Sequence, residues 1–382
     1  MDTVTGLEAQ RSPSNGLAFD VVATARSKEK GERIIKSLDP SVRPRVSFVV
    51  VPDVAQEGAF DEVLQKSGPF RYVVHTASPY KLHWDDPARD CLDPAIQGTT
   101  GLLAAIHAHA PTVQRVIITS SSAAMLSPPN HPPLYNENSW ADVTWEQAAS
   151  DAEHAYRGSK TFAERAAWDF MARHRPAFGL AVINNTYTFG PLPRSLPPRS
   201  LAASVNTSNQ RIHDLISGKM RSGVHPTAPV FTFVDVRDVA LAHVRAMTVP
   251  EADGKRFYVV GGYFSNPRIA GIVRRRFREL EAGGWLPPPE LAEERDDFPE
   301  DHWGFDNSRS KEVLGLEYRG LEESVVDTVA SIMSLGAPAL AGQGKVTSDS
   351  SGEDDGSGIG DRGSGVLDAS VPTGEISVAH EA

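Results

Sequence analysis

The chain has 382 residues, of which 40% are hydrophobic and 23% are charged, and it carries a formal net charge of −11. This composition is ordinary for a globular protein, and the length allows one large or two modest domains with a sizeable core. The acidic balance disfavours a broad nucleic-acid-binding surface, which needs clustered lysine and arginine. No run of eighteen apolar residues is present, so we expect no membrane span.

The N-terminal residues lack a basic segment followed by an apolar one, so we expect no signal peptide. Cys91 is the single cysteine, which excludes an intrachain disulfide and suits a reducing compartment. These features together predict a cytoplasmic protein. The histidines are scattered without the spacing of metal ligands, so we expect no metal site.

Short β-branched apolar runs alternate with helical patterns in the first half of the chain, which predicts βαβ units around a buried parallel sheet. The expected strands are residues 19–25, 46–51, 70–75, 114–120 and 178–184. The expected helices are residues 28–38, 57–66, 88–109 and 152–174. Right-handed crossovers then give a Rossmann-like, doubly wound α/β fold.

The sequence changes character after residue 190, where a proline-rich loop begins. We expect residues 1–190 to form the sheet domain and residues 191–336 to form a smaller region that caps it, with some segments returning to the sheet. Residues 337–382 are rich in Gly, Ser and Asp, with eight acidic side chains against two basic ones. Such a segment cannot offset the entropy of ordering, so we expect a disordered acidic tail.

Three polar residues carry the chemistry that the sequence predicts. Tyr156 and Lys160 are four residues apart in an expected helix and therefore project from one face. Ser121 follows an expected strand, at the edge where open α/β sheets bind ligands. A free phenol has a pKa of about 10, and a neighbouring cation lowers that pKa. The three side chains could therefore protonate a carbonyl oxygen, with Tyr156 as general acid and Ser121 as a second donor.

The motifs around these residues are collectively specific. They are Ala25–Lys30, Val51–Asp53, His75–Pro79, Thr119–Ser121, Asn136–Trp140, Ala155–Lys160, Phe189–Pro191, Val205–Ser208, Val234–Val239 and Asp306–Lys311. With them, the chain resembles an extended short-chain dehydrogenase/reductase of the dihydroflavonol-4-reductase-like group, and most of all the fungal NADPH-dependent methylglyoxal and ketone reductases. The resemblance runs from about Phe19 to Gly336.

The resemblance implies an NADPH cofactor and a role for each matching residue. Ser121, Tyr156 and Lys160 would be catalytic, and Lys160 and Tyr156 would also contact the cofactor. The other implied cofactor contacts are Arg26, Lys30, Asp53, Val54, Thr76, Ala77, Ser78, Thr188 and Ser208. Among these, the Arg26 guanidinium would hold a 2′-phosphate, with Lys30 adding charge. The implied substrate pocket contains Tyr80, Ser122 and Tyr187.

Two segments depart from the family pattern. The family's Asn-Pro before the cofactor loop is Asn184-Asn185 here, which leaves a more polar strand end. At the start, Val4-Thr-Gly6 resembles the beginning of a glycine-rich phosphate turn, but the later glycines are absent and Pro13 interrupts any helix. A shortened gene model, a divergent working N-terminus and a loss of cofactor binding all remain open.

The sequence therefore predicts an NADPH-dependent reductase that converts an aldehyde or ketone to an alcohol, acting as a monomer or homodimer. Its substrate would be a methylglyoxal-like oxoaldehyde or a secondary-metabolite carbonyl. One alternative is a nucleotide-sugar epimerase or dehydratase on the same fold. Another is a non-catalytic dinucleotide-sensing or interaction protein that has lost its phosphate loop.

Overall fold

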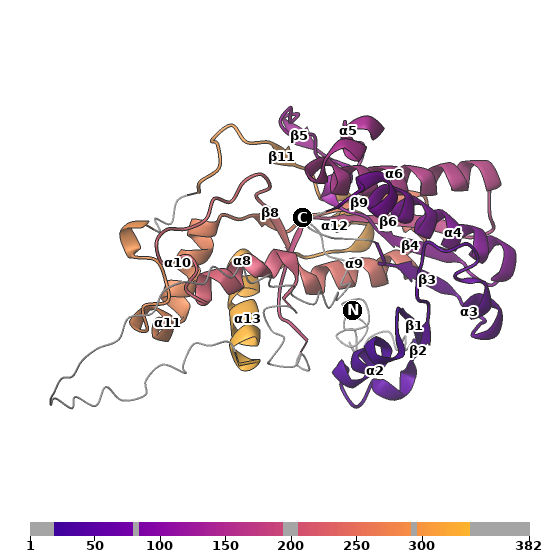
Figure 1. Cartoon of the computed structure of the whole chain (residues 1–382), viewed down its shortest axis with the longest axis horizontal. Helices are drawn as coiled ribbons and strands as arrows, with labels where there is room; N and C mark the ends of the chain where they lie inside the picture. Colours follow the sequence, from indigo (N-terminus) through magenta and orange to yellow (C-terminus); the bar gives the residue numbers. More distant parts are fainter. Residues whose placement is uncertain (1–18, 79–83, 194–204, 292–295, 337–382) are drawn as a thin grey trace, which may run out of the picture.

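The computed structural model describes residues 19–78, 84–193, 205–291 and 296–336. The chain folds as an α/β structure in which parallel strands alternate with helices (Figure 1). The expected Rossmann-like fold is thus confirmed. The expected acidic tail lies outside the described residues.

The central element is a four-stranded parallel sheet with the strand order β3-β4-β6-β9. Its strands are β3 (Tyr72–His75), β4 (Arg115–Thr119), β6 (Gly179–Asn185) and β9 (Lys255–Val259). The first three strands match the expected ones to within two residues at each end. β9 comes from late in the chain and lies beside β6, so part of the C-terminal half completes the sheet.

Helices cover both faces of this sheet, and the two-residue period of the strands sorts the side chains between them. Val116 and Ile118 of β4 pack against one helical layer, whereas Ile117 packs against the other. The first layer contains α3 (Asp61–Lys66), α4 (Asp93–His109) and α6 (Ala152–His174), and the second contains α9 (Val236–Thr248) and α12 (Ser308–Leu314). This arrangement is a doubly wound sheet.

The first two described strands form a separate piece. β1 (Val21–Ala25) and β2 (Val46–Val50) pair in parallel, and α2 (Lys28–Ser37) connects them. No pairing joins β1 to β3 among the described residues. Doubly wound sheets of this class have the order 3-2-1-4-5-6, so the break falls where the first strand of such a sheet would lie. The N-terminal residues 1–18, where the sequence predicts an incomplete first strand and turn, are outside the described residues.

Apolar side chains of β1 and β3 are incompletely covered. Val21 and Val22 of β1 and Val73 and Val74 of β3 are only half-buried, whereas the middle of β4 and β6 is fully buried. Full burial of a valine contributes about 1.5–3 kcal/mol relative to exposure. Each of these valines therefore forgoes part of that stabilisation.

The C-terminal part adds a second core and a small mixed sheet with the order β10-β8-β7. Its strands are β7 (Tyr187–Phe189), β8 (Thr232–Asp235) and β10 (Gly262–Tyr263). Around them lie α8 (Thr207–Ile216), α10 (Asn266–Arg276), α11 (Arg278–Ala282) and α13 (Leu321–Ser334). β5 (Leu134–Tyr135) pairs with β11 (Gly304–Phe305), and α5 (Trp145–Ser150) precedes α6. Figure 1 shows this part beside the carboxyl ends of the four-stranded sheet.

Candidate active site

Ser121 lies just beyond the end of β4. The ladder between β4 and β6 continues to Ser120, whose N–H donates to the Ile183 carbonyl at 2.8 Å. The Ser121 hydroxyl then accepts from the Ala123 N–H at 3.1 Å and begins the 3-10 turn Ser122–Ala124. Ser121 is fully buried. A strand end and a capped turn thus fix this side chain at the carboxyl edge of the sheet.

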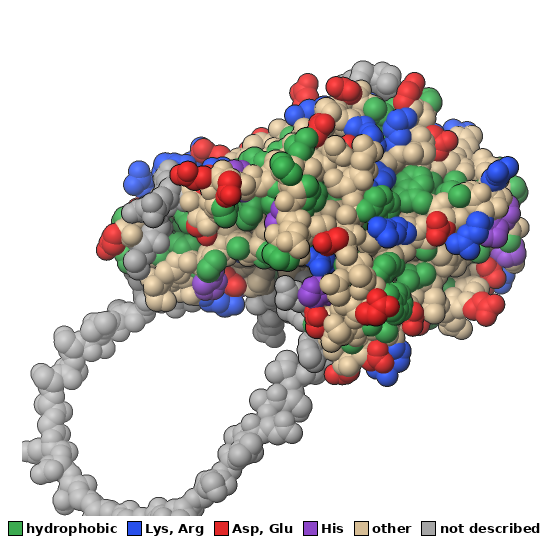
Figure 2. All heavy atoms as spheres, turned by 90° about the horizontal axis from the view of Figure 1, so that it is seen from above, with side chains coloured by type: hydrophobic (Ala, Val, Ile, Leu, Met, Phe, Trp, Pro, Cys, Tyr) green, Lys and Arg blue, Asp and Glu red, His purple; other side chains and the backbone are tan. Residues whose placement is uncertain are grey.

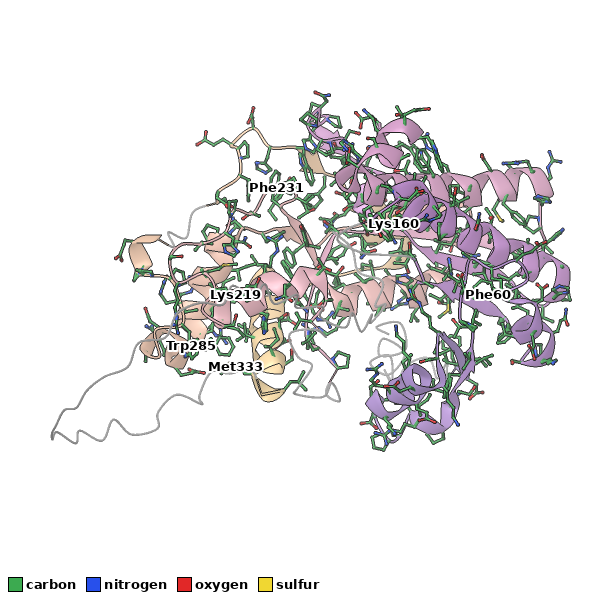
Figure 3. All side chains as sticks on the ribbon, in the orientation of Figure 1. Phe60, Lys160, Lys219, Phe231, Trp285 and Met333 are labelled. Carbon is green, nitrogen blue, oxygen red and sulfur yellow. The ribbon has the colours of Figure 1, made fainter. Side chains whose placement is uncertain are left out.

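Tyr156 and Lys160 lie on the first half of α6, which packs against the turn that follows Ser121. Asp151 caps this helix by accepting from the His154 N–H at 2.8 Å. The Lys160 Nζ atom lies 5.7 Å from the centre of the Tyr156 ring, and both side chains are buried. Figure 3 shows Lys160 in the middle of the molecule. The catalytic triad predicted from the sequence is therefore carried by two elements in contact.

Two buried titratable groups near Lys160, His75 and Cys91, are neutral. His75 ends β3, and burial together with the nearby Lys160 charge lowers the pKa of its imidazole to about 4. Burial raises the pKa of the Cys91 thiol to about 11, although Ser159 and Lys160 oppose that shift. Both groups are uncharged at neutral pH. Neither therefore adds a charge that would offset the electrostatic effect of the Lys160 ammonium on Tyr156.

Ser122 is buried beside Ser121, and its hydroxyl has no hydrogen-bond partner among the described residues. A buried hydroxyl without a partner costs about 1–3 kcal/mol. The sequence placed Ser122 in the substrate pocket together with Tyr80 and Tyr187. Tyr80 lies outside the described residues. Tyr187 lies on β7, where Arg211 covers its ring at 4.4 Å and Phe264 contacts its edge.

Thr188, the next residue of β7 after Tyr187, and Ser208, near the start of α8, bond to each other. The Thr188 N–H donates to the Ser208 hydroxyl at 3.1 Å, and Asn185 donates to the Thr188 hydroxyl at 3.0 Å. Both Thr188 and Ser208 are buried. These bonds tie the end of β6, strand β7 and the start of α8 into one unit.

The remaining predicted cofactor residues follow the carboxyl ends of β1, β2 and β3. Arg26 is exposed after β1, and Ser27 caps α2 by accepting from the Lys30 N–H at 3.3 Å. Asp53 is exposed after β2, with Val54 half-buried beside it. Thr76, Ala77 and Ser78 are half-buried after β3. Carboxyl ends of parallel strands in one sheet share an edge, so the residues after β3 line the same edge as Ser121, whereas Arg26 and Asp53 follow strands of the separate β1–β2 sheet.

Glu164 is a functional candidate that the sequence analysis missed. It lies one turn after Lys160 on α6 and is almost completely buried. Its carboxylate accepts from Ser120 and from Asn184, and it forms an ion pair with Arg256 of β9. The spacing Lys160–Glu164 was visible in the sequence and places both side chains on one helical face. The sequence alone did not indicate which residues Glu164 contacts.

The part of the chain that the structure describes contains no candidate metal site and no candidate membrane-spanning helix. No group of three or more His, Cys, Asp or Glu side chains there could hold a metal ion. Across the same ranges, no helix has the length and apolarity needed to cross a membrane. On the face in Figure 2, basic and acidic side chains are interspersed rather than gathered by sign.

Comparison with known proteins gives a consistent result. The model of the NAD dependent epimerase/dehydratase family matches residues 10–261. A ketoreductase of Aspergillus niger, azaE, is 48% identical over 82% of this chain and 90% of its own length. The NADPH-dependent methylglyoxal reductase GRE2 of Saccharomyces cerevisiae is 35% identical over 83% of this chain and 92% of its own.

A solved structure extends the comparison to three dimensions. The yeast methylglyoxal/isovaleraldehyde reductase Gre2, complexed with NADPH, superposes with a TM-score of 0.75 and is 33% identical. The match covers 87% of this chain and 94% of that one. The comparisons of fold and of sequence agree. The chain belongs to the NAD dependent epimerase/dehydratase family, the extended short-chain dehydrogenases/reductases that its motifs predicted.

Proposed function

We propose that this chain is an NADPH-dependent reductase that converts an aldehyde or ketone to the alcohol, with Ser121, Tyr156 and Lys160 as its catalytic residues. The observation that carries the proposal is the buried Tyr156–Lys160 pair packed against the Ser121 turn at the carboxyl edge of the sheet. Its ketoreductase and methylglyoxal reductase relatives support the same reaction class.

The described residues suit each end of an NADPH molecule. Arg26 and Lys30 would hold the 2′-phosphate, and Asp53 and Val54 would lie beside the adenine. Thr76, Ala77 and Ser78 would pass under the dinucleotide, and Thr188 and Ser208 would contact its far end. This binding mode requires the exposed Arg26 at the end of β1 and the half-buried Thr76–Ser78 loop to face the same dinucleotide. When bound, the reduced nicotinamide supplies the hydride.

The protein residues then manage the carbonyl oxygen. The Ser121 hydroxyl donates a hydrogen bond to that oxygen and orients the carbonyl. As hydride adds to carbon and the C=O π bond breaks, Tyr156 donates its proton to the oxygen. The Lys160 ammonium stabilises the phenolate that this transfer leaves, until solvent returns a proton. Burial of Tyr156 and Lys160 strengthens each of these interactions.

The substrate class that we propose is a reactive oxoaldehyde such as methylglyoxal or a ketone of secondary metabolism. Tyr80, Ser122 and Tyr187 would form the pocket. A serine occupies less volume than an aromatic side chain, so position 122 leaves room for a bulkier carbonyl compound. The Ser122 hydroxyl, which has no partner within the described ranges, would gain a hydrogen bond from a polar substrate group.

Replacing Tyr156 by Phe tests the proposal directly. The variant keeps the ring but loses the transferable proton, so we expect turnover of NADPH with methylglyoxal or an aromatic ketone to fall about 10²–10⁴-fold. NADPH affinity, measured by fluorescence titration, should change little. Substantial remaining turnover would exclude Tyr156 as the general acid.

A second function, a non-catalytic dinucleotide sensor, is favoured by one observation: within the described residues no pairing joins β1 to β3, and the sequence before β1 lacks the later glycines of a phosphate-binding turn. The same experiment separates the two functions. Binding of NADPH without oxidation by any carbonyl compound would support the sensor, and oxidation would exclude it.

We propose that residues 1–190 bind the dinucleotide and carry the pocket residues named above, and that residues 191–336 form a substrate-binding region that closes over them. The free thiol of Cys91 suits the cytoplasm as the place of action. Cell fractionation tests this location.

For the assembly state, we propose a monomer or homodimer. Light scattering on the purified protein distinguishes the two.

A further inference from the structure

Glu164 collects four hydrogen-bond donors in the interior of the protein. Its Oε2 atom accepts from the Ser120 hydroxyl at 2.5 Å and from Asn184 Nδ2 at 2.8 Å. Its Oε1 atom accepts from Arg256 Nε at 2.5 Å and from Trp168 Nε1 at 3.3 Å. The Glu164 side chain is 1% exposed. Both carboxylate oxygens are thus fully used by protein groups.

Two of these donors lead directly to Ser121. Ser120 is its neighbour in the chain. The same Asn184 amide that donates to Glu164 also donates to the Ser121 carbonyl oxygen at 3.2 Å. Glu164 therefore connects α6, which carries Tyr156 and Lys160, with the strand end that carries Ser121.

Arg256 anchors the other side of the carboxylate. It lies on β9 and is itself buried. Its Nη1 atom donates to the carbonyl oxygens of Glu137 and Ser139 at 2.9 and 2.6 Å, and its guanidinium stacks on the Trp140 ring at 3.8 Å. The carboxylate is therefore held in one orientation by a cation that cannot itself move freely.

We propose that Glu164 is a positioning residue, which holds Ser121 in register with Tyr156 and Lys160 through Ser120 and Asn184. The inference rests on the proposed reductase function. Tyr156 and Ser121 must reach the same carbonyl oxygen, and a displacement of about 1 Å can cost about 10²-fold in rate. Glu164 is 1% exposed and both its carboxylate oxygens accept from protein groups, so its effect would pass through Ser121.

The variant Glu164→Gln changes this linkage with little change in shape. One carboxylate oxygen becomes an NH₂ group, which cannot accept from a donor. If the remaining oxygen stays with Arg256, the NH₂ group faces Asn184 Nδ2, and two donors then meet. Asn184 must turn away and release the Ser121 carbonyl. We expect kcat to fall about 10- to 100-fold, with KM for the carbonyl substrate and Kd for NADPH within about twofold of the wild-type values.

A double-variant cycle decides whether the effect passes through Ser121. If it does, Glu164→Gln in a Ser121→Ala background should lower kcat by less than about twofold further, because the positioned group is already absent. Multiplicative losses would overturn the proposal and assign Glu164 a general structural role. So would an unchanged kcat in the single variant.

Two further variants keep the test sharp. Asn184→Ala removes the link to Ser121 but leaves the Glu164–Arg256 ion pair intact, so it should reproduce the kcat loss even if Glu164→Gln folds poorly. Asp169→Asn removes a carboxylate from the exposed surface of the same helix and should leave kcat unchanged. A wild-type protein that oxidises no NADPH with any carbonyl compound would instead contradict the proposed function, which separates the two failures.

Discussion

His75 shows how one buried residue links the site to the stability of the fold. Its pKa is lowered to about 4, chiefly by burial and further by the Lys160 charge. In the unfolded chain this imidazole binds a proton near pH 6.5. The His75 contribution to the free energy of unfolding is therefore constant above pH 6.5 and falls as the pH drops from 6.5 towards 4. The loss from this group is about 3 kcal/mol. We predict this decline in the free energy of unfolding, measured by urea denaturation across the pH range.

The variant His75→Gln cannot titrate, so its free energy of unfolding should fall less over the same interval. The exposed His107→Gln on α4 is a matched control for a histidine replacement. Identical pH profiles for the wild type and His75→Gln would show that His75 is not held neutral in the folded protein.

The catalytic residues and their supports differ in how far the sequence predicts them. Tyr156 and Lys160 share one helix, so their spacing alone places them together, and a strand end locates Ser121. Glu164 depends on Arg256, which is 92 positions away in the chain. A contact between a helix and a distant strand requires the sheet order, which local patterns do not contain.

The close contact between α5 and α6 fixes the position of α6, the helix that carries Tyr156 and Lys160. Gly158 lies between Tyr156 and Lys160, and a Cβ atom there would lie 2.3 Å from the Ala148 Cβ atom on α5. That neighbour cannot rotate away. We predict that Gly158→Ala lowers the free energy of unfolding by about 1–3 kcal/mol through overpacking. This exceeds the gain of up to about 1 kcal/mol that alanine gives in a helix.

Gly101 provides the matched control. It lies on the exposed side of α4, and a Cβ atom there would meet nothing within 4 Å. Gly101→Ala should therefore raise the free energy of unfolding by about 0.5–1 kcal/mol. Equal effects at the two positions in denaturant titrations would contradict the close helix contact.

Most elements follow from sequence periodicity, but one detail does not. The expected helix 88–109 begins as a π-helical turn, Ala88–Leu92, before α4 starts. Pro94 has no N–H to donate to the Asp90 carbonyl, so the regular ladder cannot run through this point. The apolar pattern predicts where a helix lies, whereas the width of its first turn depends on how the proline packs.

At the scale of the molecule, no pairing joins β1 to β3 within the described residues. The missing glycines and Pro13 predict an incomplete first strand and turn before β1. In the described residues, β1–β2 and β3-β4-β6-β9 are separate sheet pieces, and β1 and β3 are half-buried. A two-stranded piece is marginal alone, so β1, α2 and β2 depend on contacts with their surroundings.

Hydrogen exchange should therefore distinguish the two pieces. We predict weaker protection of backbone amides in β2 than in β6, because β6 is buried between two neighbouring strands and β2 is half-exposed at an edge.

NADPH that bridges Arg26 and the loop after β3 would bind only when the pieces are apposed. At a concentration of 100 times Kd, it should raise the opening free energy of β2 by about 2.7 kcal/mol. NADH lacks the 2′-phosphate and should protect β2 less at equal concentration, and the same reduction should follow Arg26→Ala with NADPH. Equal protection of β2 and β6 without cofactor, or a β2 that does not respond to NADPH, would mean that the sheet behaves as one unit or that the β1–β2 piece takes no part in binding.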